Sequence, residues 1–203
     1  MSKLILENPL SAKEDIREFD LFGEADISFP EGTLRIETKE GEAVLLSTGS
    51  FPSDVRIEWE FRPILCSGRA EALFAVKNAS DSDKNGGESG GSFYRLSFYR
   101  RKDAEEKGFH ISKLFKNVSG REMEVLEGAD PLPDAEGTEP GTWYKMCIIK
   151  NRDSVSFSIN GFEVIAFTDD KMKYDEFLTG GRIGFSQEAS VTAEYKNLKV
   201  TWI

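Results

Sequence analysis

The side chains best suited to binding an anion or moving a proton are concentrated in one basic segment of an acidic chain. Residues 92–121 contain eight lysines and arginines and three acidic residues, whereas the whole chain of 203 residues has a net charge of −10. A local excess of positive charge favours a small anionic ligand, because the surface as a whole repels nucleic acid and anionic membranes. We therefore expect a small-molecule ligand, without nucleic-acid or membrane partners. The sequence does not indicate an oligomeric state.

A ligand with a carboxylate requires a cation, and arginine binds a carboxylate through two parallel hydrogen bonds. Beside a neutralised carboxylate, a tyrosine or histidine can take up the proton that β-elimination releases. The candidate catalytic residues are therefore Tyr99 and His110, the single histidine. The candidate substrate-binding residues are Arg95, Ser97, Arg101, Lys116 and Asp130. The alternative is a solvated sheet face whose cations form salt bridges with Asp103, Glu105 and Glu106.

A β-hairpin over residues 92–117 is predicted to bring these side chains together. Its first arm alternates Tyr94, Leu96 and Phe98 with Arg95, Ser97, Tyr99 and Arg101. Its second arm places Phe109, Ile111 and Phe115 on one side, and His110, Ser112 and Lys116 on the other. Because side chains alternate along a strand, packing the apolar sets inward would gather the arginine, tyrosine, histidine and lysine residues on one exposed face.

Short alternating segments separated by turn residues recur along the whole chain. The clearest hairpin lies in residues 154–167, where apolar residues alternate with serines and Asn160-Gly161 supplies a type I′ turn. Residues 55–62 alternate in the same way, with Ile57 and Trp59 among the apolar positions. This pattern, with hardly any helical period, predicts one all-β domain over residues 1–203. Its expected architecture is a two-sheet antiparallel β-sandwich, with the first and last strands close in space.

A second constellation of acidic residues lies on the predicted strand at residues 55–62. Glu58 and Glu60 share one face, about 7 Å apart along the strand, which is near the separation used in two-carboxylate glycoside hydrolysis. Arg56 and Arg62 flank the pair, however, so a solvated, charged outer face is the favoured interpretation.

A weak calcium motif precedes the basic segment. Asp81, Asp83 and Asn85 match the first half of a calcium-binding loop, but the twelfth position, where a bidentate acid is needed, is Ser92. We therefore expect a flexible loop and no cofactor, with calcium as the alternative.

The two cysteines and the apolar runs bear on the cellular compartment. Cys66 and Cys147 give neither a disulfide framework nor zinc-ligand spacing, and both lie in apolar runs, which predicts buried free thiols. The first apolar run is too short for a secretory signal, and no run is long enough to span a bilayer. These features predict a cytoplasmic protein, although a removed signal peptide would leave no trace in the sequence.

Several ordered blocks resemble the YesU-like proteins of bacteria. They are YRLSFYRR at 94–101, FHISKLFKN at 109–117, GADPLP at 128–133 and GGRIGFSQEASVTAEYKNLKV at 180–200. YesU-like proteins form a family of unknown function in the concanavalin A-like lectin/glucanase superfamily. The chain departs from the family pattern at Phe115, where an arginine is usual, and at residues 121–124, where a Gly-Phe-His-like run is usual.

This resemblance implies a jelly roll with a concave sheet and a place among proteins that break down acidic plant polysaccharides; it implies no mechanism. We therefore expect a carbohydrate-binding or carbohydrate-processing protein that recognises a uronate-containing oligosaccharide on a concave sheet face. Should it be an enzyme, it would act as a glycoside hydrolase or a polysaccharide lyase. The alternative is a non-catalytic interaction domain in which the same face binds a partner protein.

Overall fold

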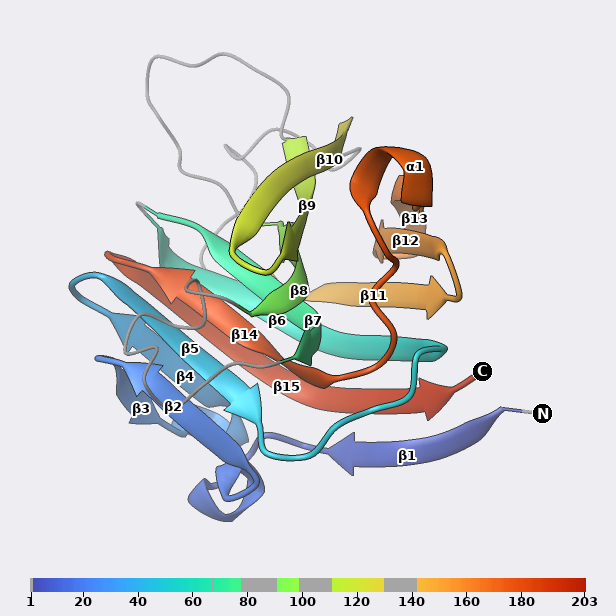
Figure 1. Ribbon diagram of the computed structural model, residues 1–203. Coiled ribbons are helices and arrows are strands. Elements are labelled where there is room, and N and C mark those ends of the chain that lie inside the picture. Colours follow the sequence, from blue (N-terminus) through green and yellow to red (C-terminus); the bar gives the residue numbers. More distant parts are fainter. Residues whose placement is uncertain (1, 67, 78–90, 99–110, 130–141) are drawn as a thin grey trace.

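The computed structural model describes residues 2–66, 68–77, 91–98, 111–129 and 142–203 and shows two antiparallel β-sheets packed face to face (Figure 1). The predicted β-sandwich is therefore confirmed. In the eight-stranded sheet the order is β13-β12-β11-β6-β15-β4-β3, with β1 also pairing with β15. In the seven-stranded sheet it is β10-β9-β8-β7-β14-β5-β2, which puts β7 in the middle. No helix in these residues is long and apolar enough to cross a membrane.

The eight-stranded sheet consists of β1 (Lys3–Asn8), β3 (Asp26–Ser28), β4 (Leu34–Thr38), β6 (Val55–Cys66), β11 (Tyr144–Asn151), β12 (Ser154–Ile159), β13 (Phe162–Thr168) and β15 (Val191–Trp202). The seven-stranded sheet consists of β2 (Phe19–Gly23), β5 (Glu42–Ser47), β7 (Ala70–Lys77), β8 (Ser92–Ser97), β9 (Ile111–Val118), β10 (Arg121–Ala129) and β14 (Arg182–Glu188). The short helical turns are η1 (Lys13–Ile16), η2 (Pro30–Gly32) and α1 (Lys171–Tyr174).

Three local predictions are confirmed by this topology. The first strand pairs with the last, Lys3 opposite Trp202. Strands β12 and β13 form a hairpin whose turn residues, Asn160 and Gly161, have φ values of 51° and 84°, as a type I′ turn requires. Strands β8 and β9 pair antiparallel, as expected for the basic hairpin, although the residues that connect them lie outside the described ranges.

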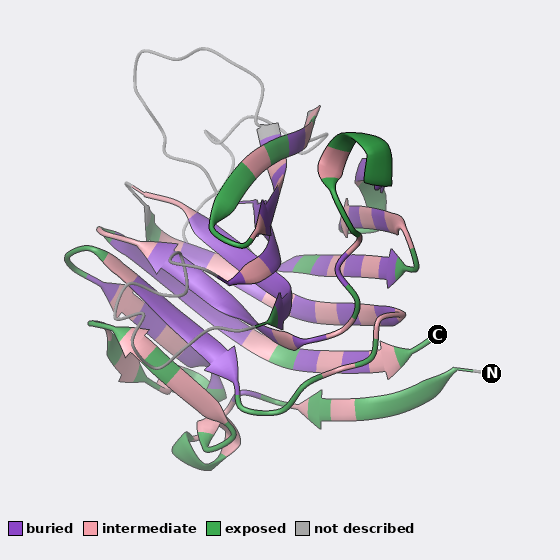
Figure 2. Ribbon diagram, in the orientation of Figure 1, coloured by how far each residue is buried: buried purple, intermediate pink, exposed green. Residues whose placement is uncertain are grey.

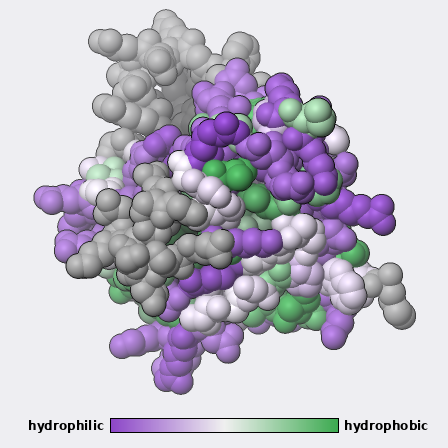
Figure 3. All heavy atoms as spheres, viewed as in Figure 1, coloured by the Kyte–Doolittle hydropathy of each residue, from purple (hydrophilic) through white to green (hydrophobic). Residues whose placement is uncertain are grey.

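Aromatic rings fill the space between the two sheets. The Trp59 ring of β6 lies 5.6 Å from the rings of Phe98 and Phe185, and the Phe61 ring lies 5.4 Å from that of Tyr195. The middle strands of both sheets are the most deeply buried, whereas β1 and α1 are largely exposed (Figure 2). On the face of the molecule shown in Figure 3, polar side chains predominate and apolar ones form only small patches, consistent with the acidic composition.

The seven-stranded sheet is also buried on its outer face, away from the aromatic core. A second apolar cluster lies there, formed by Val44, Leu46, Leu73, Val76 and Phe93. Strands β5 and β7 therefore carry apolar side chains on both faces, which explains their near-continuous apolar sequences. A charged residue placed among them must be held by specific partners, because burial of an unpaired charge is costly.

The two sheets approach each other most closely where β10 meets β13. A Cβ atom at Gly128 would lie 1.9 Å from the carbonyl oxygen of Val164, so only glycine fits this contact. We expect Gly128→Ala to destabilise the protein by about 1–3 kcal/mol through overpacking, measured by urea denaturation. Gly49→Ala is the matched control, because no atom lies within 4 Å of a Cβ placed there. Equal stability of the two variants would contradict the close approach.

Candidate functional site

The outer face of the seven-stranded sheet carries a polar cluster at its centre. On β7, Glu71 lies between its cross-strand neighbours Ser97 of β8 and Ser186 of β14. At the next position on the same face, two residues away, Arg95 of β8 lies between Leu73 of β7 and Phe115 of β9. Together with Glu122 of β10, these side chains form what we call the Glu71–Arg95 cluster, which comprises Glu71, Arg95, Ser97, Phe115, Glu122 and Ser186.

Arg95 is the central cation of this cluster. Its Nη1 donates a hydrogen bond to Glu71 Oε2 at 3.4 Å, and its Nη2 donates one to Glu122 Oε2 at 2.5 Å. The guanidinium carbon lies 4.9 Å from the centre of the Phe115 ring, a cation–π arrangement. These contacts fix the orientation of a side chain that is only 9% exposed.

Glu71 is the most strongly perturbed carboxyl group of the cluster. Burial raises its pKa to about 7, against the opposing effect of Arg95 and Arg69, and the nearby carboxylates of Glu42 and Glu188 raise it further. Its Oε1 makes no hydrogen bond to any side chain or backbone group in the described ranges. A carboxyl group with this pKa exists in both protonation states near neutrality and can therefore donate or accept a proton.

Glu71 was not singled out from the sequence. It is the one charged residue in the apolar run AEALFAV at residues 70–76, which forms the central strand β7. A single ionisable residue in such a run was the available signal, because a central strand leaves few positions exposed to water.

The structure corrects the predicted division of faces on β9. Tyr94 pairs with Lys116 and Leu96 with Leu114, so Lys116 points into the core, and Phe115 lies outside beside Arg95. The prediction that Arg95 and Lys116 share a face was therefore wrong, as was the inward placement of Phe115. Leu114 determines the orientation: it is fully buried, and the alternation then turns Lys116 inward. Ser97 shares the face of Arg95 as predicted, but it is buried.

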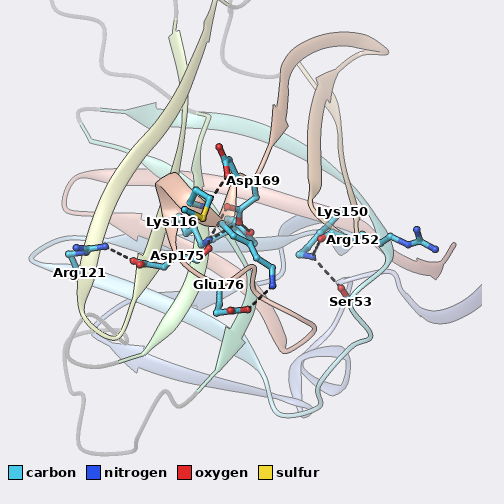
Figure 4. A network of polar contacts seen from close by, with 12 residues as sticks. Ser53, Lys116, Arg121, Lys150, Arg152, Asp169, Asp175 and Glu176 are labelled. Atoms are coloured by element: carbon cyan, nitrogen blue, oxygen red, sulfur yellow. Dashed lines mark hydrogen bonds and ion pairs between the residues drawn. The ribbon is translucent and has the colours of Figure 1, made fainter.

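Lys116 is instead part of a buried polar network at one end of the sandwich (Figure 4). Its Nζ donates to Asp169 Oδ1 at 3.0 Å and Oδ2 at 2.8 Å, and to the Asp175 carbonyl oxygen at 3.4 Å. The Tyr94 hydroxyl donates to Asp169 Oδ2. Burial, together with the bond to Asp169, raises the pKa of Tyr94, so this hydroxyl stays protonated. The network binds the chain after β13 to strand β9 and leaves no side of Lys116 exposed to a ligand.

A second lysine, Lys150, also lies near the Tyr94 ring. The Nζ atoms of Lys116 and Lys150 are 6.0 and 5.9 Å from the ring centre. Lys150 Nζ donates to the Arg152 carbonyl oxygen at 2.8 Å and to Ser53 Oγ at 3.3 Å (Figure 4). Burial lowers the pKa of Lys150, and the positive charge of Lys116 acts in the same direction.

Several predicted site residues lie outside the described ranges. They are Tyr99, Arg101, His110 and Asp130, with the calcium candidates Asp81, Asp83 and Asn85. Their assigned roles stay predictions. Within the described part of the chain, no three potential metal-binding side chains come together.

Glu58 and Glu60 line a groove of about 820 Å³ on the outer face of the eight-stranded sheet. As predicted, they share one face with Arg56. Each carboxylate has a local partner: Arg56 donates to Glu58 at 2.8 Å, and Asn197 donates to Glu60 at 2.8 Å. These contacts agree with the charged outer face that the sequence favoured.

Cys147 lines the same groove, opposite Glu58. Its thiol is half-buried, not fully buried as expected, and burial raises its pKa. A raised pKa keeps the sulfur in the less nucleophilic thiol form.

Comparison with known proteins assigns the family. Residues 3–200 match the sequence profile of DUF1961, a domain of unknown function. The chain belongs to the DUF1961 family. It is 33% identical over 211 residues to YesU, an uncharacterized protein of Bacillus subtilis (strain 168), covering 97% of this chain and 94% of YesU. The resemblance to YesU-like proteins is thus confirmed.

Solved structures agree with the fold of this DUF1961 chain. A Bacillus subtilis protein of unknown function with a galectin-like fold is 31% identical, with a TM-score of 0.86 over 98% of this chain and 95% of that one. The carbohydrate binding module CBM66 from Bacillus subtilis is 18% identical, with a TM-score of 0.58 over 89% of this chain and 93% of the module. At 18% identity, the second likeness concerns the fold alone.

Proposed function

We propose that this DUF1961 protein binds a uronate-containing oligosaccharide at the Glu71–Arg95 cluster. The observation that carries the proposal is the arrangement of Arg95, a nearly buried guanidinium held from one side by Glu71 and stacked on the Phe115 ring. An arginine fixed in this way can bind a carboxylate with two hydrogen bonds, and the adjacent ring can pack against a pyranose. The shared fold with a carbohydrate binding module supports a sugar ligand.

We also propose that Glu71 transfers a proton in the hydrolysis or β-elimination of the bound sugar. Both glycoside hydrolysis and β-elimination need a group that transfers a proton at the pH of the reaction. A carboxyl group with a pKa of about 7, beside the cation that would hold the substrate, meets this requirement. Tyr99 and His110 remain the proton-transfer candidates proposed from the sequence.

The test is calorimetric titration with tri-galacturonate, with a neutral galactose trisaccharide for comparison. Arg95→Lys keeps the charge beside Glu71 but loses the two-pronged geometry, and we expect it to weaken tri-galacturonate binding about 10- to 100-fold. Lys113→Ala is the matched control, because this lysine of β9 is partly exposed and pairs with Glu124. We expect it to change the affinity less than threefold.

Two outcomes would contradict the proposal. No loss in Arg95→Lys, or a larger loss in Lys113→Ala, would assign binding to the positive charge of this face and not to the two-pronged geometry of Arg95. Absence of any response to acidic or neutral oligosaccharides, in a protein that melts cooperatively, would favour the alternative of a protein-binding domain.

A further inference from the structure

The two ends of the Arg95 guanidinium are held by carboxylates of very different kinds. On the inner side, Nη1 contacts Glu71, a fully buried residue of the middle strand β7. On the outer side, Nη2 contacts Glu122, which comes from the edge strand β10 and has a side chain that is 33% exposed. The inner partner is fixed by its surroundings, whereas the outer partner can rotate towards water.

We infer that Glu122 occupies the position that the carboxylate of a bound uronate takes, so that the ligand displaces this side chain from Arg95. The inference rests on the proposed function, because it identifies the subsite at which the acidic sugar is recognised. Glu122 is then a residue that determines specificity: it competes with the ligand within the same molecule.

Charge balance favours displacement over simple addition. Arg95 carries one positive charge, and within the described part of the chain it already contacts the carboxylates of Glu71 and Glu122. A ligand carboxylate added beside them would place three carboxyl groups around one guanidinium. An exchange of one carboxylate for another at Nη2 leaves the charge of the cluster unchanged, and Glu122 regains its hydration as it turns outward.

The same exchange explains how the site would discriminate between sugars. A neutral sugar has no group that replaces the charge of Glu122, so displacement would cost Arg95 one of its counter-charges. A uronate restores the contact, with Phe115 available beneath the ring of the sugar. Glu122 would therefore lower the affinity for every ligand but penalise a neutral one more, which is a means of selecting against the wrong partner.

The test compares Glu122→Gln with Glu124→Gln by calorimetric titration. Both variants remove one negative charge from the same face of β10, but Glu124 contacts Lys113 and not Arg95. We expect Glu122→Gln to bind tri-galacturonate about threefold to tenfold more tightly than the unmodified protein, because the partly exposed ion pair between Glu122 and Arg95 no longer opposes binding. Glu124→Gln is expected to change this affinity less than twofold.

The possible results separate the inference from the proposed function. Tighter binding in Glu122→Gln alone supports the inference. Weaker or unchanged binding in Glu122→Gln, or an equal gain in both variants, overturns it, while the proposed function stands as long as Arg95→Lys still loses affinity. If neither the unmodified protein nor Glu122→Gln binds any sugar, the proposed function itself fails. Thermal melting of both variants checks that they fold.

Discussion

Asp169→Ala is expected to destabilise the protein by about 3–5 kcal/mol, the usual cost of leaving a buried charge without its partner. Asp169 accepts hydrogen bonds from the fully buried ammonium group of Lys116 and from the Tyr94 hydroxyl. Without the carboxylate, the buried ammonium group loses its counter-charge and the Tyr94 hydroxyl loses the acceptor of its hydrogen bond. Urea denaturation followed by fluorescence measures the loss.

Two variants make this prediction specific. Asp170→Ala, one residue further on, removes only the cap that accepts from the backbone of Met172, and should cost about 0.5–2 kcal/mol. Adding Lys116→Met to Asp169→Ala removes the uncompensated cation and should recover part of the stability. If Asp169→Ala costs no more than Asp170→Ala, the buried pair is not the stabilising element described here.

Glu71→Gln is expected to stabilise the protein at pH 8 but not at pH 4. Burial raises the pKa of Glu71 from its ordinary value of 4.5 to about 7. Below pH 4.5 the carboxyl group is protonated in both the folded and the unfolded state, so it costs nothing. As the pH rises above 4.5, the carboxyl group ionises in the unfolded chain but stays protonated in the folded protein. Folding must then reprotonate it, which costs free energy. Above pH 7 the full cost is present, roughly 3 kcal/mol at about 1.4 kcal/mol per tenfold change in proton affinity.

The glutamine side chain keeps an oxygen that can accept from Arg95 but carries no charge, so it should escape this cost. The free energy of unfolding, measured at pH 4, 6 and 8, should therefore show a growing advantage of Glu71→Gln over the unmodified protein. Glu124→Gln is the control, since Glu124 is exposed and should change stability by less than about 0.5 kcal/mol at each pH. A constant difference across the pH range would show that Glu71 does not titrate as stated.

The strand pattern could be predicted because it depends on local alternation. At residues 55–62 every apolar position faces the core, and at Asn160-Gly161 the turn type follows from two residues that tolerate positive φ. These features require no knowledge of distant partners, so the sequence was sufficient for the two-sheet fold.

The site could be predicted only in part, because it depends on partners far away in the chain. Lys116 was assigned to the exposed face because Phe109, Ile111 and Phe115 were expected to pack inward. A lysine inside a sandwich needs a buried counter-charge. That counter-charge, Asp169, lies 53 residues further along the chain. Glu71 was missed for a related reason: its cation comes from the next strand of the sheet, and no local pattern relates the two. Arg95 could be singled out as a candidate because it lies in a basic, alternating segment.

The attachment of α1 to β9 has a consequence for recognition. Lys116 of β9 pairs with Asp169 in the interior, and Arg121, the first residue of β10, pairs with Asp175 at the surface (Figure 4). These two ion pairs attach the segment after β13 to the seven-stranded sheet. Strand β9 lies between β8 and β10, which supply Arg95 and Glu122. In the proposed binding at Arg95, such bracing would pre-organise the strands that carry the guanidinium, so that part of the entropic cost of ordering them would be met during folding instead of on association.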